Sequence, residues 1–259
     1  MLRDIQVNIP FTMLRESYLP FFLDQGLNPE IGFDAHALDA FSPWDFSRVA
    51  RELQAGDLNI TLHGPFMDLA PGSADPGVRA LTRQRFEQTL RLVPVFRPKT
   101  VVFHGGYDPK RYASMKELWM ENSLEIWSWL AARVRTEGSL LMLENVFEQG
   151  PEDMRALFEP LREQAVGFCL DTGHQSAFSR VSLSEWFTSL EPYLGQLHLH
   201  DNLGEQDEHL ALGEGNIDFR MFFEQLRTKR KDPPLITLEP HREEDFLKSL
   251  TYLEGIWPW

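Results

Sequence analysis

Residues 140–171 begin with LLMLEN (140–145) and end with VGFCLD (166–171). Both runs are short and apolar, as expected of buried strands, and the residues between them follow a helical pattern. Working outward, the chain contains six more such runs: DIQVNI (4–9), PEIGFD (29–34), NITLH (59–63), TVVFH (100–104), GQLHLHD (195–201) and LITLEP (235–240). Eight strand-then-helix units predict a closed (β/α)8 barrel, the TIM-barrel architecture.

The length of the chain agrees with one barrel of this kind. A (β/α)8 barrel typically takes about 250 residues, so 259 residues predict a single domain spanning residues 1–259. The rival architecture is a doubly wound open sheet, but the glycine-rich phosphate-binding fingerprint expected after its first strand is missing. Helices are expected to begin at Ser42, Ser114 and Ser182, because each is followed by proline or by glutamate at capping-box spacing.

The composition excludes several kinds of partner. A formal net charge of -14 repels phosphate backbones, so no nucleic acid is expected to bind. The single cysteine, Cys169, cannot form a disulfide within the chain, and its strand parity with Asp171 makes it a core residue. No signal-peptide pattern and no membrane-length apolar stretch occurs in the sequence. We therefore expect a cytoplasmic protein with no membrane partner.

Side chains that can bind metal follow the later strands. The third to the eighth runs end with, in order, His63, His104, Glu144, Asp171, His198 and Glu239. Reactive residues of (β/α)8 barrels come from the carboxyl ends of the strands and the loops that follow them. All eight histidines fall at such strand ends or loops, and none falls in a predicted helix. A single strand-end histidine or glutamate is more often structural, so only the whole set of these residues indicates a functional site.

Together these side chains predict a metal site. Glu144, Asp171 and Glu239 would bring three buried carboxylates to one mouth of the barrel, where they repel one another unless a cation neutralises them. Carboxylate oxygens mixed with imidazole nitrogens suit Zn²⁺, Mn²⁺ or Co²⁺ better than Ca²⁺. The expected cofactor is therefore a divalent metal, and the sequence does not choose among these three.

One stretch carries a specific resemblance. LHLHDNLGEQDEHLALGEGNIDF (197–219), preceded by CLDTGH (169–174), is similar to the seventh-strand signature of the sugar isomerase and epimerase branch of the xylose isomerase-like barrels. The resemblance extends over essentially the whole chain. It implies a metal held by Glu144, Asp171, His198 and Glu239. It also implies that Glu144 and Glu239 transfer protons on opposite faces of a ketose, while His174, His63 and His104 contact the substrate.

The same superfamily includes the apurinic endonuclease IV enzymes, which hold three zinc ions. The resemblance to that branch implies additional metal ligands among His63, His104, His174, Asp207 and His209. This chain departs from that branch at Asp207-Glu208-His209, where the endonucleases have Asp-Arg-His. An anion in place of a cation, together with acidic residues in the other mouth loops, puts DNA cleavage in doubt.

The leading prediction is a divalent-metal-dependent enzyme that isomerises or epimerises a sugar or sugar phosphate by proton transfer through an ene-diolate. The expected partner is a small carbohydrate, and one ion per chain is expected, with three as the upper limit. One alternative is a multinuclear zinc phosphoesterase, in which His63, His104 and Glu144 hold one ion while His174, Asp207 and His209 hold another. A second alternative is a non-catalytic barrel that binds metal and sugar. The oligomeric state and the identity of the sugar stay open.

Two further sets of residues lie near the predicted mouth. Phe66, Phe103, Tyr107 and Phe147 are aromatic residues that pack in the core or form an apolar wall against a sugar ring, and packing is the favoured interpretation. Lys110, Arg111 and Arg242 are basic residues that are solvated or hold a sugar phosphate, and solvation is the favoured interpretation.

Overall fold

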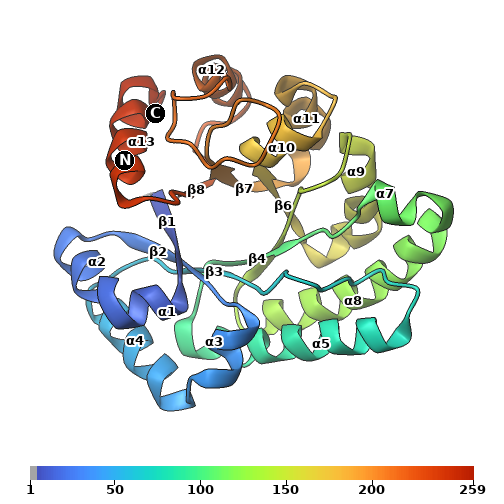
Figure 1. The fold of residues 1–259 in the computed structure, drawn as a ribbon, viewed down its shortest axis with the longest axis horizontal. Helices are drawn as coiled ribbons and strands as arrows, with labels where there is room; N and C mark the ends of the chain where they lie inside the picture. The colour runs from blue at the N-terminus through green and yellow to red at the C-terminus, as the bar shows by residue number, and fades with distance from the viewer. Residues whose placement is uncertain (1–4) are drawn as a thin grey trace.

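Eight parallel strands form a closed barrel in sequence order in the computed structural model, which describes residues 5–259 (Figure 1). The strands are β1 (Ile5–Pro10), β2 (Asn28–Gly32), β3 (Thr61–His63), β4 (Thr100–His104), β5 (Leu140–Glu144), β6 (Gly167–Asp171), β7 (Leu194–Leu199) and β8 (Leu235–Leu238). The barrel closes where β1 pairs with β8, with Ile5 beside Ile236. The predicted (β/α)8 barrel is confirmed, and every predicted run contains a strand; Asp4, the first residue of the first run, lies outside the described residues.

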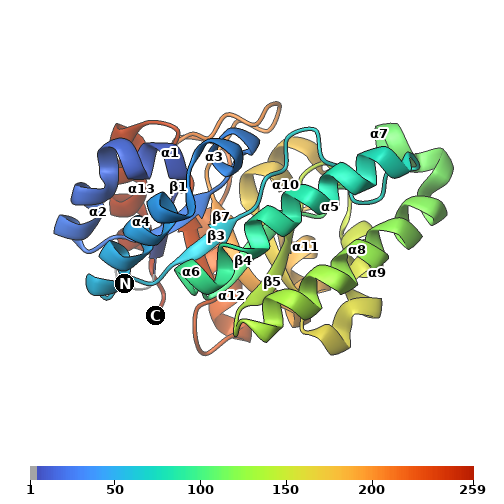
Figure 2. The same cartoon turned by 90° about the horizontal axis from the view of Figure 1, so that it is seen from below.

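Helices surround the barrel on its outer side (Figure 1). The longer ones are α4 (Pro43–Ala55), α5 (Pro76–Leu90), α8 (Lys116–Thr136), α9 (Pro151–Leu161), α11 (Leu183–Leu190), α12 (Phe219–Lys229) and α13 (Glu243–Ile256). Shorter ones are α1 (Phe11–Met13), α2 (Leu19–Gln25), α3 (Ala35–Ala40), α6 (Val93–Phe96), α7 (Pro109–Tyr112) and α10 (Thr172–Phe178). In Figure 2, α5 and α8 lie side by side. No helix within residues 5–259 combines the length and the apolar character that crossing a bilayer requires.

Two of the three predicted helix starts are confirmed. Ser42 caps α4 in a reciprocal capping box with Asp45, and the side chain of Ser182 accepts a hydrogen bond from the backbone of Glu185 at the start of α11. The prediction at Ser114 was wrong, because this residue lies inside a 3-10 turn (Ala113–Met115) and α8 begins after it. The chain is already helical there, since Asp108 caps the short α7 upstream.

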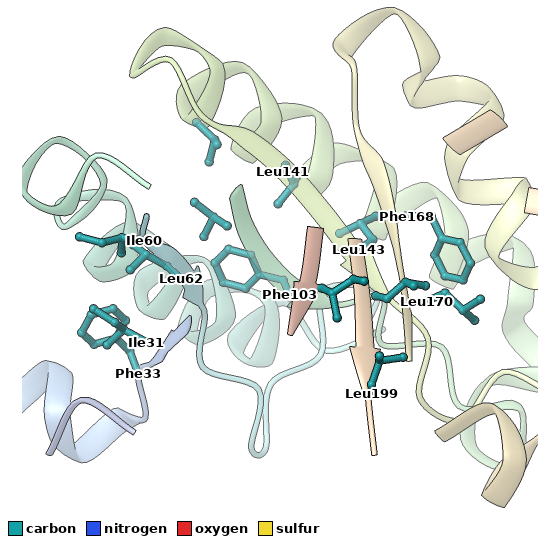
Figure 3. Packing of buried hydrophobic residues seen from close by; sticks show 14 of the residues in the cluster. Ile31, Phe33, Ile60, Leu62, Phe103, Leu141, Leu143, Phe168, Leu170 and Leu199 are labelled. Carbon is teal, nitrogen blue, oxygen red and sulfur yellow. The ribbon is translucent and has the colours of Figure 1, made fainter. Parts of the chain in front are cut away.

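The main hydrophobic core lies between the strands and the helices. Successive strand residues point to opposite faces, and Figure 3 shows the outward-facing ones, among them Leu62, Phe103 and Leu143, packed together with neighbouring apolar side chains. Trp127 is fully buried and stacks on Phe86 with ring centroids 5.4 Å apart. This apolar layer holds the strands in register and so sets the positions of the side chains at their ends.

The inside of the barrel is largely polar. Val102, Met142 and Cys169 form a small, separate apolar cluster, so the prediction that Cys169 is a core residue is confirmed. Buried polar side chains inside the barrel contact one another, among them Glu30, Thr61, Thr100, Gln196, His198 and Thr237. These buried polar side chains form the floor of the barrel and can make hydrogen bonds that orient the side chains of the site.

Candidate active site

Donor side chains meet at the carboxyl end of the barrel. The predicted site residues are distributed over the strands and loops as follows: His63 ends β3, His104 ends β4, Glu144 ends β5, Asp171 ends β6, His198 lies in β7, Glu239 follows β8, His174 lies in α10, and Asp207 and His209 lie between β7 and α12. The register of the sheet places His104 beside Glu144 and Asp171 beside His198. Because parallel strands end on the same rim, residues far apart in sequence become neighbours.

The expectation that no histidine lies in a helix was wrong. His36 lies in α3 and His174 lies in α10. In both cases an aspartate next to a strand end caps a short helix at once: Asp34 accepts a hydrogen bond from the backbone of Ala37, and Asp171 accepts one from the backbone of His174, each at 2.6 Å. This cap places the His174 imidazole in the first turn of α10, where it still faces the mouth.

Glu144 is the centre of the inner part of the site. Its side chain is 1% exposed, and its Oε2 lies 3.1 Å from His63 Nε2, 3.3 Å from His198 Nδ1 and 3.8 Å from His104 Nε2. The other oxygen, Oε1, lies 3.1 Å from His174 Nδ1. One carboxylate therefore contacts histidines from four different elements.

Glu239 faces Glu144 across His198. Its Oε1 lies 3.0 Å from His198 Nδ1, the same nitrogen that Glu144 approaches. Its side chain is 11% exposed against 1% for Glu144, so Glu239 is the more accessible of the two carboxylates. This arrangement places two carboxylates around one imidazole nitrogen at the open end of the barrel.

Two buried atoms of this inner group fit a cation. Asp171 Oδ2 and His198 Nδ1 are buried and make no hydrogen bond of acceptable geometry with any residue in 5–259. A buried carboxylate oxygen without a partner is costly. The backbone of Asp171 is fixed, because its N–H and C=O both pair with the side chain of Asn145. Donor atoms that lie within 4.8 Å of one another include those of Glu144, Asp171 and His174, and those of Glu30, His198 and Glu239, so the inner part of the site offers donors to a divalent metal.

Glu30 is a site residue that sequence reasoning missed. It lies in β2, is fully buried, and its Oε1 is 2.9 Å from His198 Nε2. A carboxylate on the far nitrogen of a histidine fixes which nitrogen faces a metal. Its Oε2 accepts hydrogen bonds from Gln196, Thr61 and Thr237. A glutamate inside an otherwise apolar run was the available signal for this role.

An outer group of donors lies beside the inner one. His174 Nε2 and His209 Nε2 each lie 3.3 Å from Asp207 Oδ2. The loop that carries Asp207 and His209 is organised by Asp201, whose buried carboxylate accepts backbone hydrogen bonds from Asn202, Gly213, Gly215 and Ile217. His174 contacts Glu144 as well as Asp207, so it connects the two groups.

Electrostatics support ionised carboxylates in this buried place. Burial by itself raises the pKa of Glu144, but the imidazoles of His198, His104 and His174 together outweigh it and hold that pKa well below its usual value. Burial likewise works against the charged form of His174, but the carboxylates of Asp171, Asp207 and Glu144 together raise the pKa of His174 well above the ordinary value. Burial lowers the pKa of His104 to about 3, so this imidazole is neutral and offers a lone pair at neutral pH.

The aromatic residues near the mouth divide into two kinds. Phe103 and Tyr107 are buried, as the packing interpretation predicted. Phe66 is 46% exposed and stacks on His104 with centroids 4.3 Å apart, and Phe147 is 48% exposed and packs on Phe178. The exposed faces of Phe66 and Phe147 are available to a substrate.

The basic residues near the mouth are exposed or already paired. Lys110 and Arg111 are exposed in α7, and Arg242 is bound to Asp245 at 2.7 Å. These environments agree with the interpretation of all three as solvated loop charges.

We predict that the unfolding free energy of the protein depends on pH through the carboxyl group of Glu148. It is buried in the loop after β5, and its two oxygens accept backbone hydrogen bonds from Val146 and Tyr107. Burial raises its pKa from about 4.5 to about 7. Because the folded state prefers the protonated form, the unfolding free energy should fall by about 3 kcal/mol as the pH rises from 4.5 through 7. Urea unfolding of the wild type and Glu148→Gln at several pH values measures this.

The glutamine variant lacks the titrating group, so the difference in stability between the two proteins should change across this pH range. Glu152→Gln, at an exposed position in α9, is the matched control and should follow the wild type. A difference between wild type and Glu148→Gln that is constant with pH would contradict the assignment.

Comparisons with known proteins agree with this geometry. The family described as xylose isomerase-like TIM barrel matches residues 29–256. Uncharacterized protein MJ1311 of Methanocaldococcus jannaschii is 28% identical over 205 residues, which cover 76% of this chain and 70% of the relative. Probable endonuclease 4 of Mycobacterium leprae is 25% identical over 213 residues, which cover 77% of this chain and 81% of the relative.

Solved structures show the same architecture. The TTHB071 protein from Thermus thermophilus, soaked with ZnCl2, superposes with a TM-score of 0.85 at 27% identity and covers 98% of both chains. A D-tagatose 3-epimerase-like protein superposes with a TM-score of 0.83 at 24% identity, covering 98% of this chain and 96% of the other. At that identity the second similarity supports the fold alone.

Proposed function

This chain belongs to the family of xylose isomerase-like TIM barrels, and from that premise we propose that it is a divalent-metal-dependent isomerase or epimerase of a sugar or sugar phosphate. The observation that carries the proposal is the pair of carboxylates, Glu144 and Glu239, on either side of His198 Nδ1 at 3.3 and 3.0 Å. Two carboxylates at one open mouth can serve the two faces of a small carbohydrate.

In the proposed enzyme, Glu144, Asp171, His198 and Glu239 hold the metal. When bound there, a divalent cation polarises a carbonyl and the neighbouring hydroxyl of the substrate. It also lets the carboxylates stay ionised in a buried place. The proposed metals are Mn²⁺, Co²⁺ and Zn²⁺, because an imidazole nitrogen mixed with the carboxylate oxygens suits these ions better than Ca²⁺.

The chain's own side chains would then move the proton. The two carboxylate oxygens of Glu239 differ in their contacts. Oε1 contacts His198, whereas the histidine nitrogen nearest to Oε2 is His209 Nδ1, which is 3.8 Å away. Oε2 is therefore the less constrained oxygen. We assign Glu239 Oε2 to remove a proton from the carbon next to the carbonyl and Glu144 to the opposite face. The resulting ene-diolate of the substrate is reprotonated on the other face in an epimerase, or on the neighbouring carbon in an isomerase.

The other residues of the mouth would hold the substrate. His63 Nδ1 lies 2.8 Å from the backbone oxygen of Gly64, which orients the ring so that Nε2 faces Glu144 and the mouth. His104 and His174 offer further ring nitrogens to sugar hydroxyls. The exposed face of Phe66 suits the apolar C–H face of a sugar ring.

A specific observation favours the second candidate, a multinuclear zinc phosphoesterase. His174, Asp207 and His209 form a donor group that a single-metal isomerase does not need, and His63, His104 and Glu144 form another. In such an enzyme these residues would hold zinc ions, which would supply an activated water for the hydrolysis of a phosphoester. Glu208 and the net charge of -14 argue against a DNA substrate, so a small phosphoester would be the substrate of this candidate.

The deciding experiment is an incubation of metal-reconstituted protein with a panel of ketoses and ketose phosphates in deuterated water. The proposed function predicts metal-dependent incorporation of one deuterium at the carbon next to the carbonyl, with loss of the signal in a chelator. Parallel assays measure phosphate release from small phosphoesters, and elemental analysis counts the metal per chain. Phosphate release with three zinc ions and no deuterium exchange would replace the proposal by the phosphoesterase. The absence of both activities from the metal-loaded protein would favour a binding protein.

A further inference from the structure

Three imidazoles stack face to face at one side of the site. The rings of His200 and His209 are 3.7 Å apart with planes inclined by 6°, and those of His209 and His241 are 3.8 Å apart with planes inclined by 11°. His200 follows β7 and is 1% exposed, His209 lies in the loop before α12, and His241 lies in the exposed loop after β8. The stack therefore joins three separate segments of the chain.

The central ring of the stack belongs to a strained residue. His209 has a backbone φ of 49°, in the left-handed region that residues with a Cβ atom rarely adopt. Such a conformation persists only where the surroundings hold it. Its ring Nδ1 lies 3.3 Å from the backbone oxygen of Glu239, and its Nε2 lies 3.3 Å from Asp207 Oδ2. The contacts on both ring faces are those of His200 and His241.

The geometry of the stack indicates which of its rings can bind the same metal ion. The donor atoms of His174, His200, Asp207 and His209 lie within 4.8 Å of one another. A metal binds an imidazole nitrogen in the plane of the ring, and one ion cannot lie in both ring planes when the two rings are stacked nearly parallel with their centroids 3.7 Å apart. His200 and His209 in this arrangement therefore do not share an ion. His200 Nε2 instead lies 3.2 Å from Asp171 Oδ1.

The fold makes room for the buried ring of the stack. A Cβ atom on residue 173 would lie 1.9 Å from His200 Cε1, so the ring fits only because Gly173 has no side chain. Neither ring nitrogen of His200 forms a hydrogen bond of acceptable geometry with the residues that the structure describes. The flat face of the ring is thus its principal contact with His209.

We propose that His200 and His241 are positioning residues that clamp the His209 ring from both faces. The clamp aims His209 Nε2 at the same point as Asp207 and His174, so these three side chains form an outer donor group for a divalent metal. His200 and His241 are not ligands of that metal. This role goes beyond the proposed reaction and does not depend on which substrate the protein uses.

The first test measures zinc affinity by competition with a chromophoric chelator, without any sugar. Asp207→Asn identifies which binding step belongs to the outer group. His241→Ala removes the exposed ring and should weaken that step by about 3- to 10-fold, the range that one aromatic contact supplies. His241→Phe keeps a flat ring without nitrogens and should stay within about 2-fold of the wild type. His36→Ala, at an exposed histidine in α3, is the control.

Two outcomes of this titration would overturn the proposal. If His241→Ala binds zinc as tightly as the wild type, the ring does not position His209. If His241→Phe binds zinc as weakly as His241→Ala, a ring nitrogen of His241 matters rather than the stacked ring, and His241 is a ligand of the metal.

A second measurement needs no metal. Amide hydrogen exchange of residues 202–217 in the metal-free protein should be faster in His241→Ala than in the wild type and should be restored in His241→Phe. Equal exchange in all three proteins would also overturn the clamp. Because neither measurement uses a sugar or a phosphoester, failure of the clamp and failure of the proposed reaction are separately visible.

Discussion

Glu144→Gln should reduce the rate of deuterium incorporation into the ketose substrate by at least about 1,000-fold, which lies in the upper range for loss of a general acid or base. The side chain lies at the meeting point of His63, His174 and His198. Glutamine has nearly the same shape but no charge, so it keeps the packing and loses both a proton acceptor and an anionic metal ligand. Turnover, metal content and circular dichroism of the purified variant measure these effects.

The control for this substitution is Glu244→Gln, which removes the same charge from the same end of the barrel at a side chain that is 66% exposed. This variant should keep wild-type turnover. Glu239→Gln should lose turnover as Glu144→Gln does, because the proposed proton transfer needs both carboxylates. A Glu144→Gln protein that retains metal and exchanges deuterium within about 10-fold of the wild type would remove Glu144 from the mechanism.

Glu30→Ala should lower the unfolding free energy by about 3 to 5 kcal/mol, the cost of removing one partner of a buried charged pair. Glu30 is fully buried, and its loss leaves His198 Nε2 and Gln196 Nε2 without their carboxylate partner. Glu30→Gln is the milder change and should weaken inner-site metal binding by about 10- to 100-fold, as expected for an outer partner of a ligand. Chemical unfolding and metal titration measure the two effects.

Thr237→Val is the matched control, because it removes one hydrogen bond to the same carboxylate and one from Gln196 but leaves the carboxylate in place. Its expected cost is about 1 kcal/mol for each hydrogen bond. If Glu30→Ala is no less stable than Thr237→Val, the carboxylate does not hold His198, and the polar floor of the barrel has no part in orienting the site.

Much of the candidate site was predictable because a parallel barrel brings all its strand ends to one rim. Locating His63, His104, Glu144 and Asp171 at strand ends was therefore enough to predict that they meet. The alternation of strand residues also placed Cys169 in the interior correctly. These predictions needed only the spacing of residues along each strand and the count of strands.

Other features depended on contacts between distant segments. In the sequence, Glu30 is one acidic residue in a predicted strand. Its role is visible only in the folded barrel, where the Glu30 carboxylate on β2 contacts His198 on β7. The stack of His200, His209 and His241 requires the folded positions of three loops and strand ends. The incorrect helix start at Ser114 has the same origin, because the upstream turn capped by Asp108 had already begun.

The barrel and the side chains that reach its mouth followed from the sequence alone, because strand periodicity and position along the chain are local properties. The distances within the inner group around Glu144 and the outer group around Asp207 required the folded structure, since a ring orientation or a backbone φ of 49° at His209 depends on packing from other segments. The chemistry of the mouth therefore follows from local pattern, and its geometry follows from long-range contacts.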